Sequence, residues 1–499
     1  MFAQALREHA ESHPHRVAIE WKNEKLTWLE LSDRVGKVAR HFKKLGVENG
    51  STVALVLPNT PDFITTFLAG AVSGATILPV NPQFKVGELS FLFEQCRVSV
   101  VVVPEQRLAD YQETIDALDW PVEVVVSADY AVEGVTSFST LFAADEARCP
   151  IAADGETTFV YQYSSGSTGL PKRVSRTHDM CWAEAENISS SLNLTTDDTI
   201  LCAVPLFHTY GMGNCFFAFL KSGARLILLN QPGPFVLHCS ECLRLLEQSK
   251  ATFFPAVPYM YQIMADSGKE ADLSSLRYAI SSGTPLQRST YEQFCNKFGV
   301  RLRQLYGCTE AGCVAINIHL DPDENCDSVG SAINGVNVKL VDANREEVAP
   351  GEKGEVVIQT SALTKEYYQQ DDLNARVFDG GCFYTGDIGY NNSAGGLVLV
   401  GRKTAYIEVA GNKVNPEEIE EVIIQHALVE EVVVVGLQPT DSYNCTVKAV
   451  VVVSKDCSES EIISFCRSRL APFKVPSEVE FREELPRSPL GKILKKYLV

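Results

Sequence analysis

The sequence is short of positive charge: 44 Lys and Arg residues stand against 63 Asp and Glu residues, which gives a formal net charge of −19. Nucleic acids and anionic membranes are bound through an excess of basic residues, so this balance argues against a general binder of either kind. It leaves room for a local basic pocket around a phosphate ligand, because net charge does not report on a single cleft.

Long apolar runs are also missing. The two longest uncharged stretches, residues 63–84 and 199–220, each contain proline, glycine and several polar residues. A transmembrane helix needs about 20 predominantly apolar residues in a row, so we interpret both stretches as buried strand–helix pairs. Arg7 and Glu8 interrupt the start of the chain, which argues against a signal peptide. We therefore expect a cytoplasmic protein with no membrane span.

The 15 cysteines are scattered and lack the density of a secreted, disulfide-bonded framework. Cys239 and Cys242 form one CxxC, but no second pair follows at the spacing of a zinc ribbon. Residues 235–248 around them have a helical pattern, so we expect a structural role for both thiols.

Helical and β-rich patterns alternate through the first three fifths of the chain, which predicts parallel sheets covered by helices. Residues 27–30, Thr-Trp-Leu-Glu, have the form of a capping box and predict a helix that ends near Gly46. The strands expected in a first sheet are residues 51–58, 75–80, 98–104 and 122–127. Those expected in a second sheet are residues 157–163, 198–206, 224–229, 251–257 and 276–282.

After about residue 328, strands separated by turns at residues 336–342, 354–360 and 396–402 predict a small antiparallel β unit. From Gly401 the chain restarts with a helical pattern at residues 416–429, strands at 431–437 and 446–454, and a second helix at 458–470. We predict an α/β fold with a large N-terminal domain, residues 1–402, of two α/β subdomains plus the β unit. A mobile α+β C-terminal domain, residues 403–499, completes the prediction.

Residues 163–172, Tyr-Ser-Ser-Gly-Ser-Thr-Gly-Leu-Pro-Lys, are rich in glycine and hydroxyl groups and follow a predicted strand. Glycine lets the backbone approach a ligand closely, and the N–H groups of such a loop can form an anion-binding nest. The hydroxyls and Lys172 add donors for phosphate oxygens. The Walker A pattern is absent. By composition alone, a phosphate cradle and a polar surface loop are equally good interpretations.

This loop resembles the phosphate-binding signature of the adenylate-forming superfamily, which includes acyl-CoA synthetases, luciferases and the adenylation domains of peptide synthetases. Further segments resemble that family in the expected order, at residues 206–208, 282–286, 306–310, 384–387, 401–402 and 486–492. Any one of them would be weak evidence, whereas the ordered set spans nearly the whole chain. The resemblance implies activation of a carboxylate by ATP and Mg²⁺ to an acyl-adenylate, followed by transfer to a thiol, usually that of coenzyme A.

The resemblance also implies roles for particular residues. Three are implied to be catalytic: Lys492 bridges the carboxylate and the α-phosphate, Thr309 contacts the α-phosphate, and Glu310 ligates Mg²⁺ through a hard oxygen. The residues implied to bind the nucleotide are Ser165, Gly166, Ser167, Thr168, Gly169, Lys172, Gly283, Thr284, Tyr306, Asp387 and Arg402. Outside this context Asp387 is typical of a turn, and Lys492 of a solvated charge near a chain end.

Residues 205–213 resemble acyl-CoA synthetases and plant coumarate ligases. They contain no acid that could pair with the ammonium group of an amino acid, and a buried unpaired ammonium is costly. His208 fits either a histidine packed at a strand end or an aromatic gate. The predicted acyl pocket is apolar or weakly polar, which suits an aromatic or medium-chain aliphatic carboxylate. Its expected lining is Phe207, His208, Tyr210, Met212, Ser281, Cys308, Cys313 and Val314.

Four positions depart from the family pattern. Arg173 follows Lys172 where glycine is commoner, and Glu408 replaces a lysine of the luciferases, which weakens the luciferase interpretation. Thr404 and Ala405 stand at the inter-domain hinge, where the family usually has Asp or Lys. We still predict a hinge at Thr404, because a hinge residue need not be small.

The predicted function is therefore a carboxylate–CoA ligase whose partners are a small carboxylate and coenzyme A, with no nucleic acid. A stand-alone adenylating enzyme that loads a carrier-protein thiol is the nearest alternative. Thioester formation on free coenzyme A would separate the two. A non-catalytic nucleotide- or acyl-binding relative is a third possibility, against which the presence of Lys492 and Glu310 argues.

Overall fold

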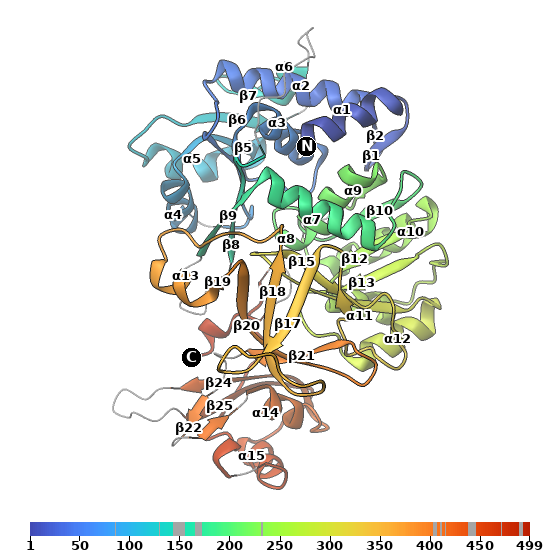
Figure 1. Ribbon diagram of the computed structural model, residues 1–499, viewed down its shortest axis with the longest axis vertical. Coiled ribbons are helices and arrows are strands. Elements are labelled where there is room, and N and C mark those ends of the chain that lie inside the picture. Colours follow the sequence, from blue (N-terminus) through green and yellow to red (C-terminus); the bar gives the residue numbers. More distant parts are fainter. Residues whose placement is uncertain are drawn as a thin grey trace. The chain divides into compact units, whose positions relative to one another are not determined.

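The structure is a computed structural model of the chain (Figure 1). It describes residues 1–84, 86–128, 130–142, 155–164, 172–230, 233–402, 407–409, 412–414, 416–437, 446–470, 472–488 and 493–499. These residues form two compact units. The first contains most of the chain up to Val338 together with Ile358–Phe383, and the second contains the described residues of Lys339–Val357 and Tyr384–Val499.

One sheet of the first unit has the strand order β7–β6–β5–β3–β4–β8–β9. Its strands are β3 (Thr52–Leu55), β4 (Thr76–Pro79), β5 (Val98–Pro104), β6 (Glu123–Ser127), β7 (Thr136–Ser137), β8 (Thr158–Ser164) and β9 (Lys172–Thr177). Neighbouring strands are parallel except for the antiparallel pair β8–β9.

The second sheet of this unit has the order β16–β15–β14–β13–β12–β10–β11–β1–β2. Its strands are β1 (Val17–Trp21), β2 (Glu24–Thr27), β10 (Thr199–Cys202), β11 (Arg225–Leu228), β12 (Phe253–Ala256), β13 (Tyr278–Ser281), β14 (Leu302–Cys308), β15 (Gly312–Ile316) and β16 (Ser331–Ala332). The strands from β14 to β1 are parallel, and antiparallel strands complete both ends.

The prediction for residues 157–163 was wrong in one respect. We expected this strand in the second sheet, followed by a helix, whereas β8 pairs with β4 of the first sheet through Ile77 and Val160 and continues into the antiparallel β9. The sequence of a buried strand is a continuous apolar run whichever sheet contains it. The pattern therefore does not identify the strands that pair with it.

Helices cover both sheets (Figure 1). Those of the first unit are α1 (Phe2–Ser12), α2 (Trp28–Lys44), α3 (Pro61–Ser73), α4 (Val86–Cys96), α5 (Leu108–Asp116), α6 (Phe138–Phe142), α7 (His178–Ser191), α8 (Thr209–Gly211), α9 (Ala218–Ser222), α10 (Cys239–Ser249), α11 (Pro258–Asp266), α12 (Arg288–Phe298) and α13 (Asp371–Val377). The capping box that begins α2 is confirmed: Glu30 N donates to Thr27 Oγ1 (3.3 Å), and Thr27 N donates to Glu30 Oε2 (2.8 Å). In the described part of the chain, no helix is long and apolar enough to cross a membrane.

The larger hydrophobic core of this unit contains side chains from both sheets and from helices that include α1, α2, α3, α7 and α9. Phe67 of α3 is fully buried in it, in edge-to-face contact with Phe159 of β8 and Phe217 of the segment before α9. A second core covers the other face of the seven-stranded sheet with residues of α4 and α5. Because both faces of that sheet are buried at its centre, the strands β3, β4 and β5 are mostly apolar, whereas the edge strand β9 is polar.

A third sheet of the described residues has the order β17–β18–β20–β19, with β21 paired to β20. Its strands are β17 (Val336–Val341), β18 (Gly354–Thr360), β19 (Phe378–Asp379), β20 (Cys382–Asn391) and β21 (Leu397–Arg402). The pairs β19–β20 and β20–β21 are antiparallel, as predicted for the β unit.

The C-terminal part of the second unit is α+β, as predicted. Its elements are β22 (Ile407–Val409), β23 (Asn412–Val414), α14 (Pro416–Ile423), β24 (Val429–Leu437), β25 (Thr446–Val453), α15 (Glu459–Arg467) and β26 (Glu478–Phe481). The helices α14 and α15 bury Ile419 and Ile462 against Val434 and Val447 of the sheet. The predicted hinge, Thr404, lies outside the described residues, so the boundary at residue 402 stays a prediction.

Candidate active site

The β14–β15 hairpin of the second sheet places the predicted catalytic pair Thr309 and Glu310 in its short connection. Glu310 is buried, at 6% exposure. Tyr367 donates its hydroxyl to Glu310 Oε1 (2.7 Å), and Thr364 N donates to the carbonyl oxygen of Glu310 (2.8 Å). A carboxylate accepts through two oxygens, so the Tyr367 bond fixes one of them and leaves the other suited to a cation. The side chain therefore fits the predicted Mg²⁺ ligand.

Lys172 begins β9 and brings a positive charge to the same place. Its Nζ lies 5.1 Å from the ring centroid of Tyr367, within the range of a cation–π contact. The structure thus places the predicted phosphate-binding lysine, Lys172, over the ring of Tyr367. The predicted metal ligand, Glu310, accepts a hydrogen bond from the hydroxyl of the same tyrosine. Tyr367 was missed in the sequence, where no motif or spacing distinguishes it from Tyr368. The remaining predicted loop residues, Ser165, Gly166, Ser167, Thr168 and Gly169, lie outside the described residues.

The atypical Arg173 has a packing role in the structure. Its guanidinium lies 4.5 Å from the ring centroid of Tyr161 and 3.3 Å from that of Tyr368, and Nη1 donates to Gln95 O (2.6 Å). The residue is buried, at 8% exposure. Arg173 directly follows Lys172 in β9. Its contacts therefore hold this part of β9 against β8 and against the segment that carries Tyr367 and Tyr368.

Gly283 and Tyr306 come from neighbouring parallel strands. Gly283 follows β13 with φ +91°, a left-handed conformation that favours glycine. Among the described residues, a Cβ atom there would meet only Val257 Cγ1, at 3.5 Å, so this side of the backbone leaves room for close approach by a ligand. Ser282 Oγ donates to Leu305 O (2.8 Å), which fixes this turn beside Tyr306. Thr284, half-buried, follows in the same turn. The adenine-flanking role of Gly283 and Tyr306 stays a prediction.

The segment from Thr209 to Phe217 carries the predicted acyl-pocket residues Tyr210 and Met212. It begins as α8 and continues as a π-helix, η2 (Met212–Phe217), a rare form that is frequent at functional sites. Tyr210 is buried and donates its hydroxyl to Ala256 O (3.1 Å) and Ile280 O (3.0 Å). This bonding seats the segment against the ends of β12 and β13, next to the predicted lining residue Ser281.

The other predicted lining residues differ in burial. Phe207 is half-buried. His208 is exposed, and its Nδ1 accepts a hydrogen bond from Tyr210 N (3.2 Å). His208 is therefore the N-cap of α8 rather than a packed histidine. Cys308 is half-buried, and Cys313 and Val314 are buried in the hairpin. Burial raises the pKa of the Cys313 thiol, so that surface is uncharged.

A buried ion pair of Arg176 and Glu184 adjoins the segment from Thr209 to Phe217, and sequence analysis did not find it. Residues 205–213 contain no acid, whereas Glu184 belongs to α7 and lies against Gly213 only through the fold. Nothing in the local pattern of α7 marks the residue, since a glutamate on a helix is normally exposed.

In the second unit, the predicted ribose-binding residues Asp387 and Arg402 are direct partners. They lie opposite each other on β20 and β21, and Arg402 Nε donates to Asp387 Oδ1 (2.7 Å). Asp387 is buried at 8% exposure, while the Arg402 side chain is 51% exposed. Lys492, the predicted catalytic lysine, lies outside the described residues.

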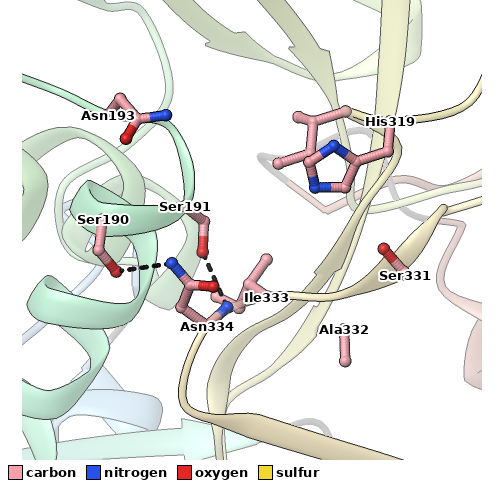
Figure 2. Close-up of a pocket in the computed structure, with 9 residues that line it drawn as sticks. Ser190, Ser191, Asn193, His319, Ser331, Ala332, Ile333 and Asn334 are labelled. Atoms are coloured by element: carbon pink, nitrogen blue, oxygen red, sulfur yellow. Dashed lines mark hydrogen bonds between the residues drawn. The ribbon is translucent and has the colours of Figure 1, made fainter.

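A cavity of about 220 Å³ lies elsewhere in the first unit, between the end of α7 and the segment around β16. Figure 2 shows Asn334 at its wall, bonded to Ser190 Oγ (3.2 Å) and Ser191 Oγ (2.9 Å). None of the predicted site residues that the structure describes lines this cavity, and its described lining contains no Asp, Glu, Lys or Arg.

A family model described as "AMP-binding enzyme" matches residues 6–368, and one described as "AMP-binding enzyme C-terminal domain" matches residues 418–492. The chain belongs to the AMP-binding enzyme family. This confirms the resemblance inferred from the ordered motifs.

Relatives in the AMP-binding family match over almost their whole length. A 4-coumarate–CoA ligase of Pinus taeda is 30% identical over 485 residues, which cover 94% of this chain and 88% of that protein. A long-chain-fatty-acid–CoA ligase of Bacillus subtilis is 28% identical over 528 residues, covering 99% and 93%. The crystal structure of an anthranilate CoA ligase with anthranoyl-AMP superposes with a TM-score of 0.86 at 25% identity, covering 100% of this chain and 96% of that one. These matches confirm the α/β fold class and agree with the predicted class of AMP-forming carboxylate–CoA ligase.

Proposed function

We propose that this AMP-binding enzyme is a carboxylate–CoA ligase. It joins a carboxylic acid to the α-phosphate of ATP with release of pyrophosphate. It then transfers the acyl group to the thiol of coenzyme A with release of AMP. The observation that carries the proposal is the arrangement of Lys172, Tyr367 and Glu310, in which the last residue of the glycine- and serine-rich motif and a buried carboxylate contact the same tyrosine.

Displacement at the α-phosphate spreads negative charge over phosphoryl oxygens, so the site must supply cations and fixed donors. Lys172 supplies an ammonium group to these oxygens. Glu310, held by Tyr367, suits Mg²⁺, which when bound would neutralise phosphate charge. Thr309 precedes Glu310 in the hairpin and adds a hydroxyl. In the second unit, Arg402 orients the Asp387 carboxylate, which can accept from both hydroxyls of a ribose.

The acyl substrate that we propose is an aromatic or medium-chain aliphatic acid. Support comes from the burial of Tyr210, Met212 and Cys313, which makes most of the predicted lining apolar. An α-amino acid is a poor candidate. The acid that reaches this region, Glu184, is already neutralised by Arg176, so an ammonium group would be desolvated without a counter-charge.

The acceptor that we propose is free coenzyme A, reached by rotation of the C-terminal domain, residues 403–499, about Thr404. A site that first encloses ATP with Lys492 and then admits a long pantetheine thiol can hardly do both in one fixed arrangement. A carrier-protein thiol is the alternative acceptor.

The test measures pyrophosphate release with a panel of aryl, short, medium and long carboxylates and common amino acids, with and without coenzyme A. We expect acid-dependent pyrophosphate release, acyl-CoA formation without any carrier protein, and little turnover of amino acids. Glu310→Gln should lower adenylate formation by roughly 10²–10³-fold, the usual cost of one charged transition-state contact. The control Glu292→Gln changes an exposed glutamate of α12.

Pyrophosphate release without acyl-CoA would favour the carrier-loading alternative. Turnover of an amino acid above that of every other acid would contradict the proposed substrate class. No release with any acid would contradict the proposed function.

A further inference from the structure

Residues 364–368 lie along the edge of β9, the strand at the end of the seven-stranded sheet. Tyr367 forms an isolated antiparallel bridge with Val174 of β9, and Tyr368 N donates to Arg173 O (3.1 Å). These contacts attach the segment without making it a regular strand of the sheet. A short attachment with few backbone hydrogen bonds opens readily, so side-chain contacts must add to the hold on Tyr367.

The bridge between Val174 and Tyr367 determines which side chains share a face. Successive side chains of an extended chain point to opposite faces, and residues that are directly opposite or diagonal on two neighbouring chains share one face. Arg173 is opposite Tyr368, and its guanidinium lies 3.3 Å from that ring centroid. Lys172 is diagonal to Tyr367 on the other face, with its Nζ 5.1 Å from the ring centroid. The two chains therefore carry one cation–aromatic pair on each face.

Arg173 connects Tyr368 to the rest of the sheet. It is 8% exposed, and its guanidinium also lies 4.5 Å from the ring centroid of Tyr161 on β8. Nη1 donates to Gln95 O (2.6 Å), whereas Nε has no hydrogen-bond partner among the described residues. Gln95 Oε1 in turn accepts from the hydroxyl of Tyr163 (2.6 Å), which pairs with Arg173 in the β8–β9 register. Gln95 thus joins the two strand ends that flank the glycine- and serine-rich motif, and Arg173 extends this hold to Tyr368.

We propose that Arg173 is a positioning residue for the nucleotide site. It holds the ring of Tyr368 on one face and thereby fixes the direction of Tyr367 on the other. The hydroxyl of Tyr367 then donates to Glu310, while its ring contacts Lys172. The inference rests on the proposed ligase function, in which Lys172 and Glu310 serve the phosphates and their Mg²⁺. Arg173 therefore affects binding of the triphosphate rather than binding of AMP or of the acid.

The experiment measures equilibrium binding of MgATP and of AMP by calorimetry, without acid or coenzyme A. Arg173→Met removes the charge and the hydrogen-bond donor but keeps a long side chain in the buried position. Apparent affinity falls with the fraction of molecules in which the site is assembled. Loss of a desolvated cation–π contact therefore predicts that the Kd of MgATP rises roughly 3- to 30-fold, while the Kd of AMP changes by less than about twofold.

Two further variants show whether the cation itself matters. Arg173→Lys keeps a positive charge beside Tyr368 but loses the planar guanidinium, so its Kd for MgATP should lie between those of the wild type and Arg173→Met. The matched control is Arg97→Met. It removes an exposed cation–π contact of the same unit, 4.8 Å from the ring centroid of Trp120, and should bind both nucleotides as the wild type does.

Kinetics separate positioning from a general loss of activity. In Arg173→Met the KM for MgATP should rise, while the KM for the acid and the rate of thioester formation from supplied acyl-adenylate stay near their wild-type values. A double-mutant cycle with Tyr367→Phe then tests the route of the effect. Because Arg173 acts through Tyr367, Arg173→Met should cost less MgATP affinity in the Tyr367→Phe background than in the wild type. Additive losses overturn the inference.

An unchanged Kd of MgATP in Arg173→Met also overturns the inference, and so does an equal loss of affinity for AMP, which indicates a general packing role. If Arg173→Met does not fold, Tyr368→Leu removes the other partner of the contact and has the same expected and contrary results. Absence of acyl-CoA formation with every acid overturns the proposed ligase function instead, and the comparison of MgATP with AMP binding still decides the role of Arg173.

Discussion

Tyr367→Phe removes a single hydroxyl at the centre of the proposed nucleotide site. The ring remains, so the contact with Lys172 Nζ at 5.1 Å is retained, while the 2.7 Å hydrogen bond to Glu310 Oε1 is lost. A hydrogen bond to a charged, buried acceptor is worth about 1.5–3 kcal/mol, which corresponds to roughly 10- to 150-fold if it is expressed in the transition state. We therefore expect adenylate formation to slow by at least tenfold.

The assay is pyrophosphate release at saturating acid and MgATP, beside thioester formation from supplied acyl-adenylate. The first rate should fall and the second should stay near the wild-type value, because Glu310 acts where the triphosphate is attacked. Tyr368→Phe is the matched control: its hydroxyl accepts only from Gln369 Nε2 (3.1 Å) on an exposed surface in the described contacts. Equal rates for the two variants would refute the idea that Tyr367 positions the Glu310 carboxylate.

Three other variants test separate parts of the molecule. Lys492→Ala should abolish adenylate formation, with a loss of rate on the order of 10²–10³-fold, and should spare thioester formation from supplied acyl-adenylate. Equal loss of both half-reactions would contradict the role assigned to Lys492. Thr404→Pro fixes φ near −65° and should suppress one half-reaction, thioester formation above all, whereas normal rates of both would exclude a hinge there. Burial lowers the pKa of His178 from 6.5 to about 4, because the buried site favours the neutral ring. The neutral ring therefore contributes its full stabilisation to the fold above pH 6.5. This contribution to the free energy of unfolding is lost as pH falls through about 4. His178→Phe should remove that part of the pH dependence of urea unfolding, and the same slope in both proteins would be the contrary finding.

Local structure followed closely from local sequence. Thr27 and Glu30 predicted the start of α2, because a capping box satisfies donors within one turn and needs no distant partner. Gly283 likewise has the backbone conformation that suits a close approach, since φ is a property of the residue and its neighbours. The alternation of strands and helices gave the class of fold, although β8 was assigned to the wrong sheet.

The amino-acid sequence by itself determined the family, the order of the motifs and the types of residue that the chemistry needs. Only the tertiary structure decided which side chains face one another. Glu310 meets Tyr367, and Glu184 lies against Gly213 and Gly312, through contacts that join elements distant in the chain. The physical reason is that the partner of a buried polar group is chosen by packing in three dimensions, and the repeating patterns of a helix or strand record only which face is buried.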